Sequence, residues 1–376
     1  TMFLSVFKNL FKYILYYDFN LNTKKKFFFK KKLSHFCKLK KEKVIKELKN
    51  ILSKKRNIVI TTHFNPDADA LGSSLGLYNY LKKEKHEVHV IVPNDYPDFL
   101  TWMKGNNKVI VYNKEKNKSK NLILNSDLIF CLDFNSLERI FDLGDIINSS
   151  SSKKILIDHH PNPSKFYDYS LHSSKAAATC ELIYDFINMM GNIENIDKSI
   201  SECLYAGIMT DTGSFKFSST SSKVHRIVAD LIDRGVDINK IHRLIYDNNS
   251  LNKLKLLGFS ISKRLNFLEE YNTAYFILNR NDLKRFKYKK GDTEGLVNYA
   301  LSIKNVNLAC IIIEEKDLIK FSFRSIGEFS VNNFAKKHFN GGGHKNAAGG
   351  RLDENLNVAL SKFLKLIKAN KKKLIY

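Results

Sequence analysis

The sequence predicts an α/β fold in two domains, a parallel-sheet N-terminal domain followed by a smaller α/β C-terminal domain. Short apolar runs such as residues 57–62 alternate with stretches of helical spacing such as residues 69–86. Strands that alternate with helices indicate βαβ units and a mainly parallel sheet. The length of 376 residues is also enough for about two domains of ~100–200 residues each.

The first domain begins with an amphipathic helix, "KEKVIKELKNILSKK", at residues 41–55, because its apolar residues recur at helical spacing. Residues 69–86 predict a second helix with a face of small residues, and residues 174–234 are mostly helical in pattern. Strands are predicted within the apolar runs 57–62, 87–93, 126–134 and 153–160. We therefore place the first domain at residues 41–235.

The second domain follows a stretch without a strong strand pattern, residues 236–256, which we interpret as a linker. Residues 251–270 have helical spacing, and strands are predicted within the apolar runs 272–279, 307–315 and 318–325. The second domain is thus placed at residues 257–376. Residues 1–40 form a basic, aromatic extension that we expect to be poorly ordered.

The composition limits the class of protein but does not select a function. The net charge of +24 is compatible with a polyanionic partner such as nucleic acid, but an AT-rich coding bias explains the many lysines equally well. The five cysteines are scattered without a C-x-x-C pair, which argues against a disulfide framework or a zinc knuckle. The apolar N-terminal stretch is interrupted by Lys8 and Lys12 and is too short and charged for a membrane span. We expect a cytoplasmic protein without stable membrane association.

Polar side chains gather where the predicted strands of the first domain end. They are His63, Asp67, Asp69, Asp133, Asp158, His159 and His160, joined by Asp211 at the end of a helix. Parallel strands align their carboxyl ends at one edge of a sheet, where ligands bind, so we expect these groups to converge. A single aspartate, such as Asp69, could simply cap a helix, but four such ends in one chain favour a common site.

Converging carboxylates require a cation, because each added negative charge raises the pKa of the others. Aspartates and histidines without cysteine favour Mn²⁺ or Mg²⁺ over a structural zinc. Six ligands with one bridging carboxylate would hold two ions ~3.5–4 Å apart, which activate a water and clamp a phosphoryl oxygen. The strand ends therefore predict a dinuclear centre that hydrolyses phosphate esters.

Two features of the second domain indicate an anion site. The segment "FNGGGHKNAAGG" places three glycines before His344, where backbone amides can approach an anion and the imidazole can donate to a phosphate. Arg324 ends the apolar run "FSFRS", where a guanidinium can hold a phosphate through two hydrogen bonds. A flexible turn and a surface salt bridge are the plain alternatives.

Taken in order, the motifs resemble those of a known family. "THFNPDADALGSS", the aspartate of "CLDFNS", "IDHHPN" and "MTDTGSFKF" resemble the four motifs of the DHH phosphoesterase superfamily, and "GGGHKNAAGG" resembles the signature of its associated C-terminal domain. The resemblance spans about residues 42–368. The compact two-domain arrangement is most similar to the bifunctional oligoribonuclease and 3′-phosphoadenosine-5′-phosphate phosphatase branch, the nanoRNases. Ala68 replaces a glycine frequent in the family motif, a departure that leaves the metal ligands untouched.

The resemblance implies an active site in the cleft between the two domains. One Mn²⁺ would be held by His63, Asp67 and Asp133, and the second by Asp69, Asp133, His159 and Asp211. His160 would act beside the metals, while Asp158 would orient a histidine. Arg324, Gly342, Gly343 and His344 would bind the substrate.

The implied activity is Mn²⁺-dependent, with Mg²⁺ as the other candidate ion. It would hydrolyse short single-stranded RNA to mononucleotides and 3′-phosphoadenosine-5′-phosphate (PAP) to AMP. A phosphodiesterase of cyclic or linear dinucleotides, such as pApA or pGpG, is the alternative. The GGGH signature argues against a family II pyrophosphatase. The compact length argues against a RecJ-type exonuclease. The complete ligand set argues against a non-catalytic nucleotide-binding module. A homodimer is left open.

Overall fold

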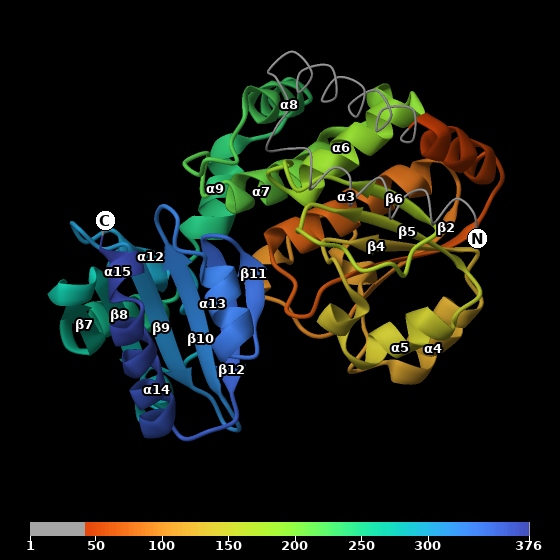
Figure 1. Cartoon of the computed structure of the whole chain (residues 1–376). Helices are drawn as coiled ribbons and strands as arrows, with labels where there is room; N and C mark the ends of the chain where they lie inside the picture. The colour runs from red at the N-terminus through yellow and green to blue at the C-terminus, as the bar shows by residue number, and fades with distance from the viewer. Residues whose placement is uncertain (1–41, 376) are drawn as a thin grey trace, which may run out of the picture.

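The computed structural model describes residues 42–375, so the predicted extension at residues 1–40 lies outside the described residues. Two six-stranded sheets, each with helices packed against it, lie side by side (Figure 1). The first sheet is parallel and the second is mixed. The predicted fold class is therefore confirmed. Among the described residues, no helix has the length and apolar character needed to cross a membrane.

The first sheet has the strand order β3-β2-β1-β4-β5-β6. Its strands are β1 (Asn57–Thr62), β2 (Glu87–Val92), β3 (Ile110–Val111), β4 (Leu128–Leu132), β5 (Lys153–Asp158) and β6 (Tyr169–His172). β1 and β4 are adjacent although a helical crossover and two strands separate them in sequence. The direction of winding reverses between them, and open α/β sheets bind ligands beyond the carboxyl ends of strands at such a point.

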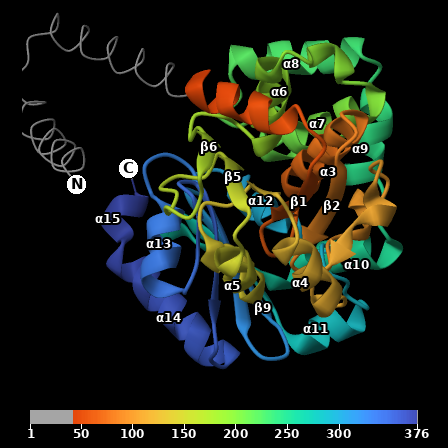
Figure 2. The ribbon, with the colours of Figure 1, turned by 90° about the vertical axis from the view of Figure 1, so that its right-hand side faces the viewer.

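Helices cover both faces of this sheet. They are a helix at residues 42–52, α3 (Ala68–Lys83), α4 (Lys116–Leu124), α5 (Asp142–Ser149), α6 (Thr179–Met190), α7 (Lys198–Asp211), α8 (Ser222–Asp233) and α9 (Ile238–Tyr246). Figures 1 and 2 show α6 and α8 on one side and α4 and α5 on the other. Alternate residues of β1 point to opposite faces of the sheet. Ile58 and Ile60 lie in the core beneath α3 and α6, whereas Val59 lies in the core beneath α5. Burial on both faces explains the continuous apolar runs.

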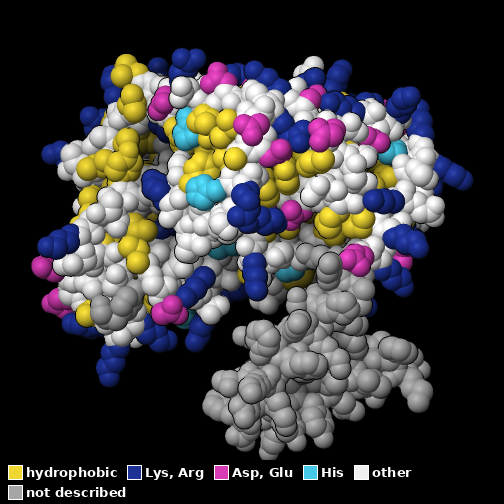
Figure 3. Space-filling view, turned by 90° about the horizontal axis from the view of Figure 1, so that it is seen from above, with side chains coloured by type: hydrophobic (Ala, Val, Ile, Leu, Met, Phe, Trp, Pro, Cys, Tyr) yellow, Lys and Arg dark blue, Asp and Glu magenta, His cyan; other side chains and the backbone are white. Residues whose placement is uncertain are grey.

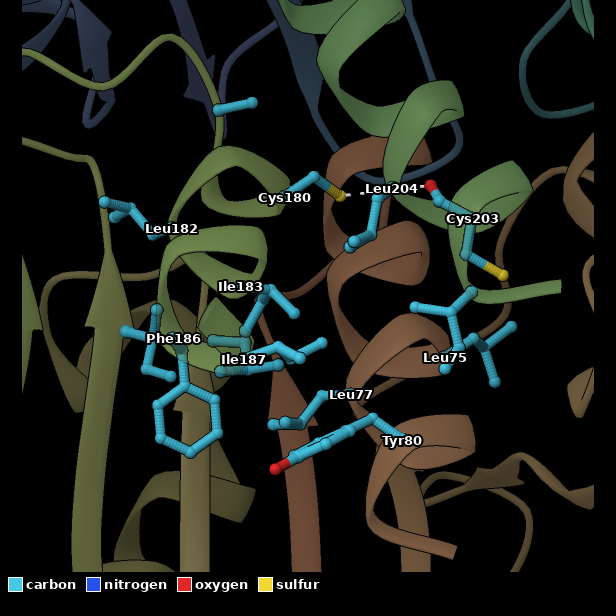
Figure 4. Packing of buried hydrophobic residues seen from close by; sticks show 14 of the residues in the cluster. Leu75, Leu77, Tyr80, Cys180, Leu182, Ile183, Phe186, Ile187, Cys203 and Leu204 are labelled. Carbon is cyan, nitrogen blue, oxygen red and sulfur yellow. Dashed lines mark hydrogen bonds between the residues drawn. The ribbon is translucent and has the colours of Figure 1, made fainter. Parts of the chain in front are cut away.

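The α3 helix packs closely against α7 because small residues lie between them. A Cβ on Gly76 would come 2.8 Å from a side-chain carbon of Leu204 on α7, and one on Gly72 would overlap the Cys203 carbonyl. On a second face, Leu77 and Tyr80 of α3 pack beside Phe186 of α6 (Figure 4). The small-residue face predicted for this helix therefore brings α7, and with it Asp211, close to α3.

The chain passes from the first core to the second within the predicted linker. Ile245 of α9 packs in the core of the first sheet, and Leu256 of α10 (Leu251–Phe259) packs in a core of the second. The helical prediction for residues 251–270 is wrong beyond Arg264, because the π-helical turn at Ser260–Arg264 that continues α10 leads into β7 (Leu265–Leu268). This edge strand forms by pairing with β8, a contact that local helical spacing does not report.

The second sheet has the order β11-β12-β10-β9-β8-β7. Its remaining strands are β8 (Thr273–Leu278), β9 (Leu308–Glu314), β10 (Ile319–Ser325), β11 (Gly342–His344) and β12 (Ala347–Leu352). The helices are α11 (Arg280–Arg285), α12 (Leu296–Leu301), α13 (Val331–His338), α14 (Leu356–Ala369) and α15 (Lys371–Leu374). Phe321 and Phe323 of β10 face the core beneath α13 and α14, so the residues alternating with them point away from it.

The lysines and arginines do not gather in one patch on the face of the molecule seen in Figure 3. Their side chains are scattered over the part of this face that the grey atoms leave visible. The four cysteines within residues 42–375, Cys131, Cys180, Cys203 and Cys310, are buried free thiols. Net charge alone therefore does not locate a binding site.

Candidate active site

The carboxyl ends of β1 and β4 form the centre of the candidate site. The two strands pair in parallel with Thr62 opposite Leu132, so His63 and Asp133 emerge next to each other. His63 Nε2 lies 3.4 Å from Asp133 Oδ2. Asp133 has a φ of 63°, in the left-handed region that most side chains avoid and that is frequently found at functional sites.

Asp67 completes a first cluster with His63 and Asp133. Its Oδ1 caps α3 by accepting hydrogen bonds from the amides of Asp69 and Ala70, each 3.0 Å long. Its Oδ2 lies 3.7 Å from His63 Nε2. His63 Nδ1 is 2.9 Å from the Phe64 carbonyl oxygen, so a neutral ring keeps its proton on Nδ1 and presents Nε2 to the cluster. Asp67 thus caps a helix and faces the site at once.

His159 lies at the centre of a second cluster on the other side of Asp133. Its Nε2 is 3.3 Å from Asp133 Oδ1, 3.4 Å from Asp211 Oδ2 and 3.9 Å from Asp69 Oδ2. Asp133 therefore presents Oδ2 to His63 and Oδ1 to His159. This is the arrangement expected of a carboxylate that bridges two cations.

Asp69 is held by the N-terminus of α6. Its Oδ2 accepts a 2.6 Å hydrogen bond from the Thr179 amide, and its Oδ1 accepts a 2.8 Å bond from the Cys180 amide. The Thr179 hydroxyl donates a 2.9 Å bond to Asp133 Oδ1. Thr179 is not among the site residues predicted from the sequence. The local sequence does contain a feature that points to this contact. Ala178 is the N-cap of α6 and has no side-chain acceptor. The first amides of α6 therefore need an acceptor from another part of the chain.

Asp158 and His160 form a buried pair beside the two clusters. Asp158 Oδ1 accepts hydrogen bonds from His160 Nδ1 at 2.8 Å and from the His160 amide at 3.1 Å. The His160 ring stacks on His344, with ring centroids 4.6 Å apart and planes 22° apart. Because His344 belongs to the second sheet, both domains contribute to the site. Burial, together with His160 and His159, lowers the pKa of His344 to about 3.

Arg324 borders the same site from β10. Arg324 and His344 are both paired with Ala347 of β12, which brings them near each other. Burial lowers the pKa of the Arg324 guanidinium, and nearby Glu294 and Asp211 partly offset this effect. Arg324 therefore lies near carboxylates of the site, and its Nη1 donates a 3.0 Å hydrogen bond to the Phe323 carbonyl oxygen.

Glu294, which the sequence analysis missed, is a further carboxylate near the site. It is exposed as a residue, yet the protein around its carboxyl, followed by Asp67, raises the pKa of that group. Lys253, Arg324 and Lys320 act in the opposite direction. Nothing in the local sequence distinguishes this glutamate from a surface residue.

The glycine-rich segment is a packed hairpin rather than an open loop. Gly342 and Gly343 lie in β11, and the Gly343 amide donates a 3.1 Å hydrogen bond to Asn332 Oδ1 of α13. A Cβ on Gly343, whose φ is 151°, would overlap the Ala347 carbonyl. The expectation of a free amide is therefore wrong at Gly343, because the glycine permits close pairing of β11 with β12.

The residues present fit divalent cations. The ligand atoms of His63, Asp67 and Asp133 lie within 4.8 Å of one another, as do those of Asp69, His159 and Asp211. Among the described residues, His159 Nε2 is one of the few buried side-chain atoms without a hydrogen-bond partner. A buried polar atom without a partner is costly, and a cation would satisfy it. The oxygen-rich donor set without cysteine matches Mn²⁺ or Mg²⁺.

Binding of Mn²⁺ should release protons and strengthen as the pH rises. Burial lowers the pKa of His63, but its bonds to Asp133 and Asp67 outweigh this effect and raise that pKa to about 10. Burial and Asp133 raise the pKa of Asp69 to about 7. Both folded-state values are raised, so at pH 7 the metal-free site holds protons that a metal must displace. We expect the Mn²⁺ dissociation constant, measured by calorimetry, to fall by at least about tenfold per pH unit between pH 6 and 8, and more steeply below pH 7, where Asp69 also holds a proton. A pH-independent constant would contradict the ligand assignment.

Two family models match the chain in succession. The model of the DHH family, N-terminal domain, matches residues 57–208, and the model of the DHHA1 domain matches residues 272–372. The first match contains the two strands that meet at the site, and the second contains Arg324 and His344.

Several known proteins are similar over most of their length. The bifunctional oligoribonuclease and PAP phosphatase NrnA of Bacillus subtilis (strain 168) is 28% identical over 307 residues, which cover 81% of this chain and 92% of the relative. The protein of the same name from Thermus thermophilus is 29% identical, over 78% of this chain and 84% of the relative. The crystal structure of an exopolyphosphatase-related protein from Bacteroides fragilis has a TM-score of 0.84 and 39% identity, and covers 88% of this chain and 97% of that chain.

Proposed function

The chain belongs to the DHH family and carries a DHHA1 domain, and we propose on this premise that it is a Mn²⁺-dependent phosphoesterase of short RNA. It hydrolyses oligoribonucleotides to mononucleotides and PAP to AMP. The observation that supports this most directly is Asp133, whose two oxygens face two separate clusters of Asp and His ligands. The names of the relatives, bifunctional oligoribonuclease and PAP phosphatase, supply the substrate class.

The ligand sets follow from the two clusters. His63, Asp67 and Asp133 would hold one ion, and Asp69, Asp133, His159 and Asp211 would hold the other. When bound, such a pair activates a water and polarises the phosphoryl group, which lowers the barrier by several kcal/mol. The chain itself fixes these ligands in advance, through the Asp67 cap of α3 and the Asp69 cap of α6.

His160 and Asp158 act together in proton transfer to the leaving group. The bond from His160 Nδ1 to Asp158 Oδ1 fixes the ring and leaves Nε2 to exchange a proton with the substrate. His344 and Arg324 come from the second domain and hold the phosphate in line with the metal ligands. Gly342 and Gly343 keep the His344 strand close to β12, so that this histidine reaches His160.

A substrate panel tests this function. We expect the full chain with Mn²⁺ to hydrolyse pApA, a five-nucleotide RNA and PAP, with lower rates in Mg²⁺. Turnover is measured by separation of the released mononucleotides, with the Asp133→Asn variant as the inactive control. Preference for a cyclic dinucleotide, or for pApA over both the five-nucleotide RNA and PAP, would replace the proposed function with the dinucleotide phosphodiesterase. Absence of metal-dependent turnover on every substrate would exclude both.

A further inference from the structure

One face of the second sheet presents cations in register along two strands. Lys320 of β10 is directly opposite Arg351 of β12, and Arg324 is directly opposite Ala347. Directly paired residues point to the same face of a sheet, and residues two apart on a strand share that face. The four residues therefore lie on the face opposite Phe321 and Phe323, which are buried beneath α13 and α14.

The middle of this face is made of small residues. Between the two cationic ends lie Ser322 and Gly349, which are paired with each other. A Cβ added to Gly349 would meet only the Phe321 carbonyl oxygen, at 3.6 Å, within 4 Å. The surface at Gly349 is therefore open, and nothing in the described chain fills it.

The far end of the face extends well beyond the candidate metal site. Arg351 is four residues along β12 from Ala347, which is about 13 Å at the rise of an antiparallel strand. Ala347 pairs with His344, whose ring stacks on His160. Because stacked nucleotides advance by about 3.4 Å each, this span corresponds to several nucleotides of a single strand rather than to one.

An aromatic pair of the first domain faces this far end. Arg351 Cζ lies 5.4 Å from the ring centroid of Phe141, and Phe141 packs edge-on against Phe64 with centroids 4.8 Å apart. Phe64 directly follows the metal-ligand candidate His63. Phe141 is 44% exposed and has a φ of 51°, which is unfavourable for a bulky side chain. An exposed phenylalanine held in a strained backbone beside an arginine offers a surface on which a nucleobase can stack.

A purely structural contact between the domains explains this arrangement less well. Lys290 already joins the domains through hydrogen bonds to the Asn65 side chain, 2.5 Å, and the Asp95 carbonyl, 3.0 Å. Domain contact alone does not account for the open space at Gly349 or for the exposed part of the Phe141 side chain.

We infer that the face bounded by Lys320 and Arg351, here called the distal track, binds the second and following nucleotides of an oligonucleotide. Lys320 and Arg351 contact its phosphates, and Phe141 stacks on one of its bases. The inference rests on the proposed function and adds a chain-length preference to it. PAP, a single nucleotide, uses only the metal site with Arg324 and His344.

The test compares substrates of different length in variants of the distal track. We expect Lys320→Ala, Arg351→Ala and Phe141→Leu each to lower kcat/KM on a four-nucleotide RNA by about tenfold or more, mainly through KM, while kcat/KM on PAP stays within about twofold. Gly349→Leu should block the track with the same selectivity. Lys365→Ala is the matched control, since Lys365 is an exposed lysine of α14, on the other face of the sheet.

A binding measurement separates this inference from the proposed function. Fluorescence anisotropy of a labelled tetranucleotide with phosphorothioate linkages reports binding without turnover, and we expect it to weaken in Arg351→Ala and Gly349→Leu but not in Lys365→Ala. If the wild-type chain binds this probe but does not hydrolyse the unmodified tetranucleotide, the proposed function fails and the track stands. Equal losses on PAP and RNA, or unchanged binding in the track variants, would overturn the track.

Discussion

The Asp133→Asn variant is expected to fold normally and to lose at least about 10³-fold in kcat/KM on every substrate. Asp133 is the residue whose carboxylate faces both clusters, at 3.4 Å from His63 and 3.3 Å from His159. Removal of its charge weakens both candidate metal sites. A loss of about 4 kcal/mol of transition-state stabilisation, within the range that metal ions supply, corresponds to about 10³-fold.

Asparagine is the informative substitution at this position because it can adopt the same backbone conformation as Asp133. The φ of 63° is tolerated by Asn but is costly for Ala. An Asn side-chain oxygen can still accept the hydrogen bond from the Thr179 hydroxyl, so the loss of activity reports the charge rather than misfolding. Metal content by elemental analysis and the unfolding midpoint should accompany the kinetics.

Asp127→Asn is a matched control at the opposite end of the same strand. Asp127 is exposed and precedes β4, where its Oδ2 accepts a 2.8 Å hydrogen bond from the Asn57 amide. This variant should retain activity within about twofold. Near-normal turnover of Asp133→Asn with full metal content would reject a bridging role for Asp133.

The metal-ligand candidates could be located from sequence because the parallel sheet aligns the ends of its strands. Buried strands appear as continuous apolar runs, so the residues that follow them are visible as a sudden change to Asp and His. In the structure, the Asp133 carboxylate lies 3.4 Å from His63 Nε2 and 3.3 Å from His159 Nε2. The site also lies where the strand order reverses, between β1 and β4, as is general for ligand sites in open α/β sheets. This rule can be applied without knowledge of individual contacts.

The features that sequence could not provide depend on pairing between distant segments. β7 becomes a strand only because β8 lies beside it, although its own residues have helical spacing. The role of Thr179 depends on α6 pointing its first amides at Asp69, 110 residues earlier in the chain. Likewise, the alignment of Lys320 with Arg351 follows from the register of β10 and β12, which a single sequence does not reveal.

The Gly207→Ala variant is expected to be destabilised and to lose most of its activity even though only one methyl group is added. Gly207 lies in α7, and a Cβ there would come 2.7 Å from Asp69 Oδ1 and 2.9 Å from Asp69 Cα, and would overlap the Cys180 sulfur. These atoms belong to α3 and to the first turn of α6, so α7 must move away from both. Overpacking of this kind costs about 1–3 kcal/mol in the free energy of unfolding.

The same shift moves a candidate metal ligand. Asp69 is fixed by the Thr179 and Cys180 amides, and Asp211 ends α7 itself. A displacement of about 1 Å in a catalytic arrangement can cost about 10²-fold in rate, so kcat/KM of the folded fraction should fall by that factor. Calorimetric unfolding and Mn²⁺ titration measure the two effects separately.

Gly258→Ala supplies the control that isolates packing from helix propensity. Gly258 is an exposed glycine of α10, and a Cβ there would meet nothing within 4 Å. Alanine should therefore raise the free energy of unfolding by about 0.5–1 kcal/mol, the usual gain in a helix, with activity unchanged. If the free energy of unfolding falls in Gly207→Ala and rises in Gly258→Ala, then Gly207 serves to allow the close approach of α7 to Asp69 and not to provide backbone flexibility. A gain in stability at both positions would show instead that α7 has room to shift without disturbing the ligands.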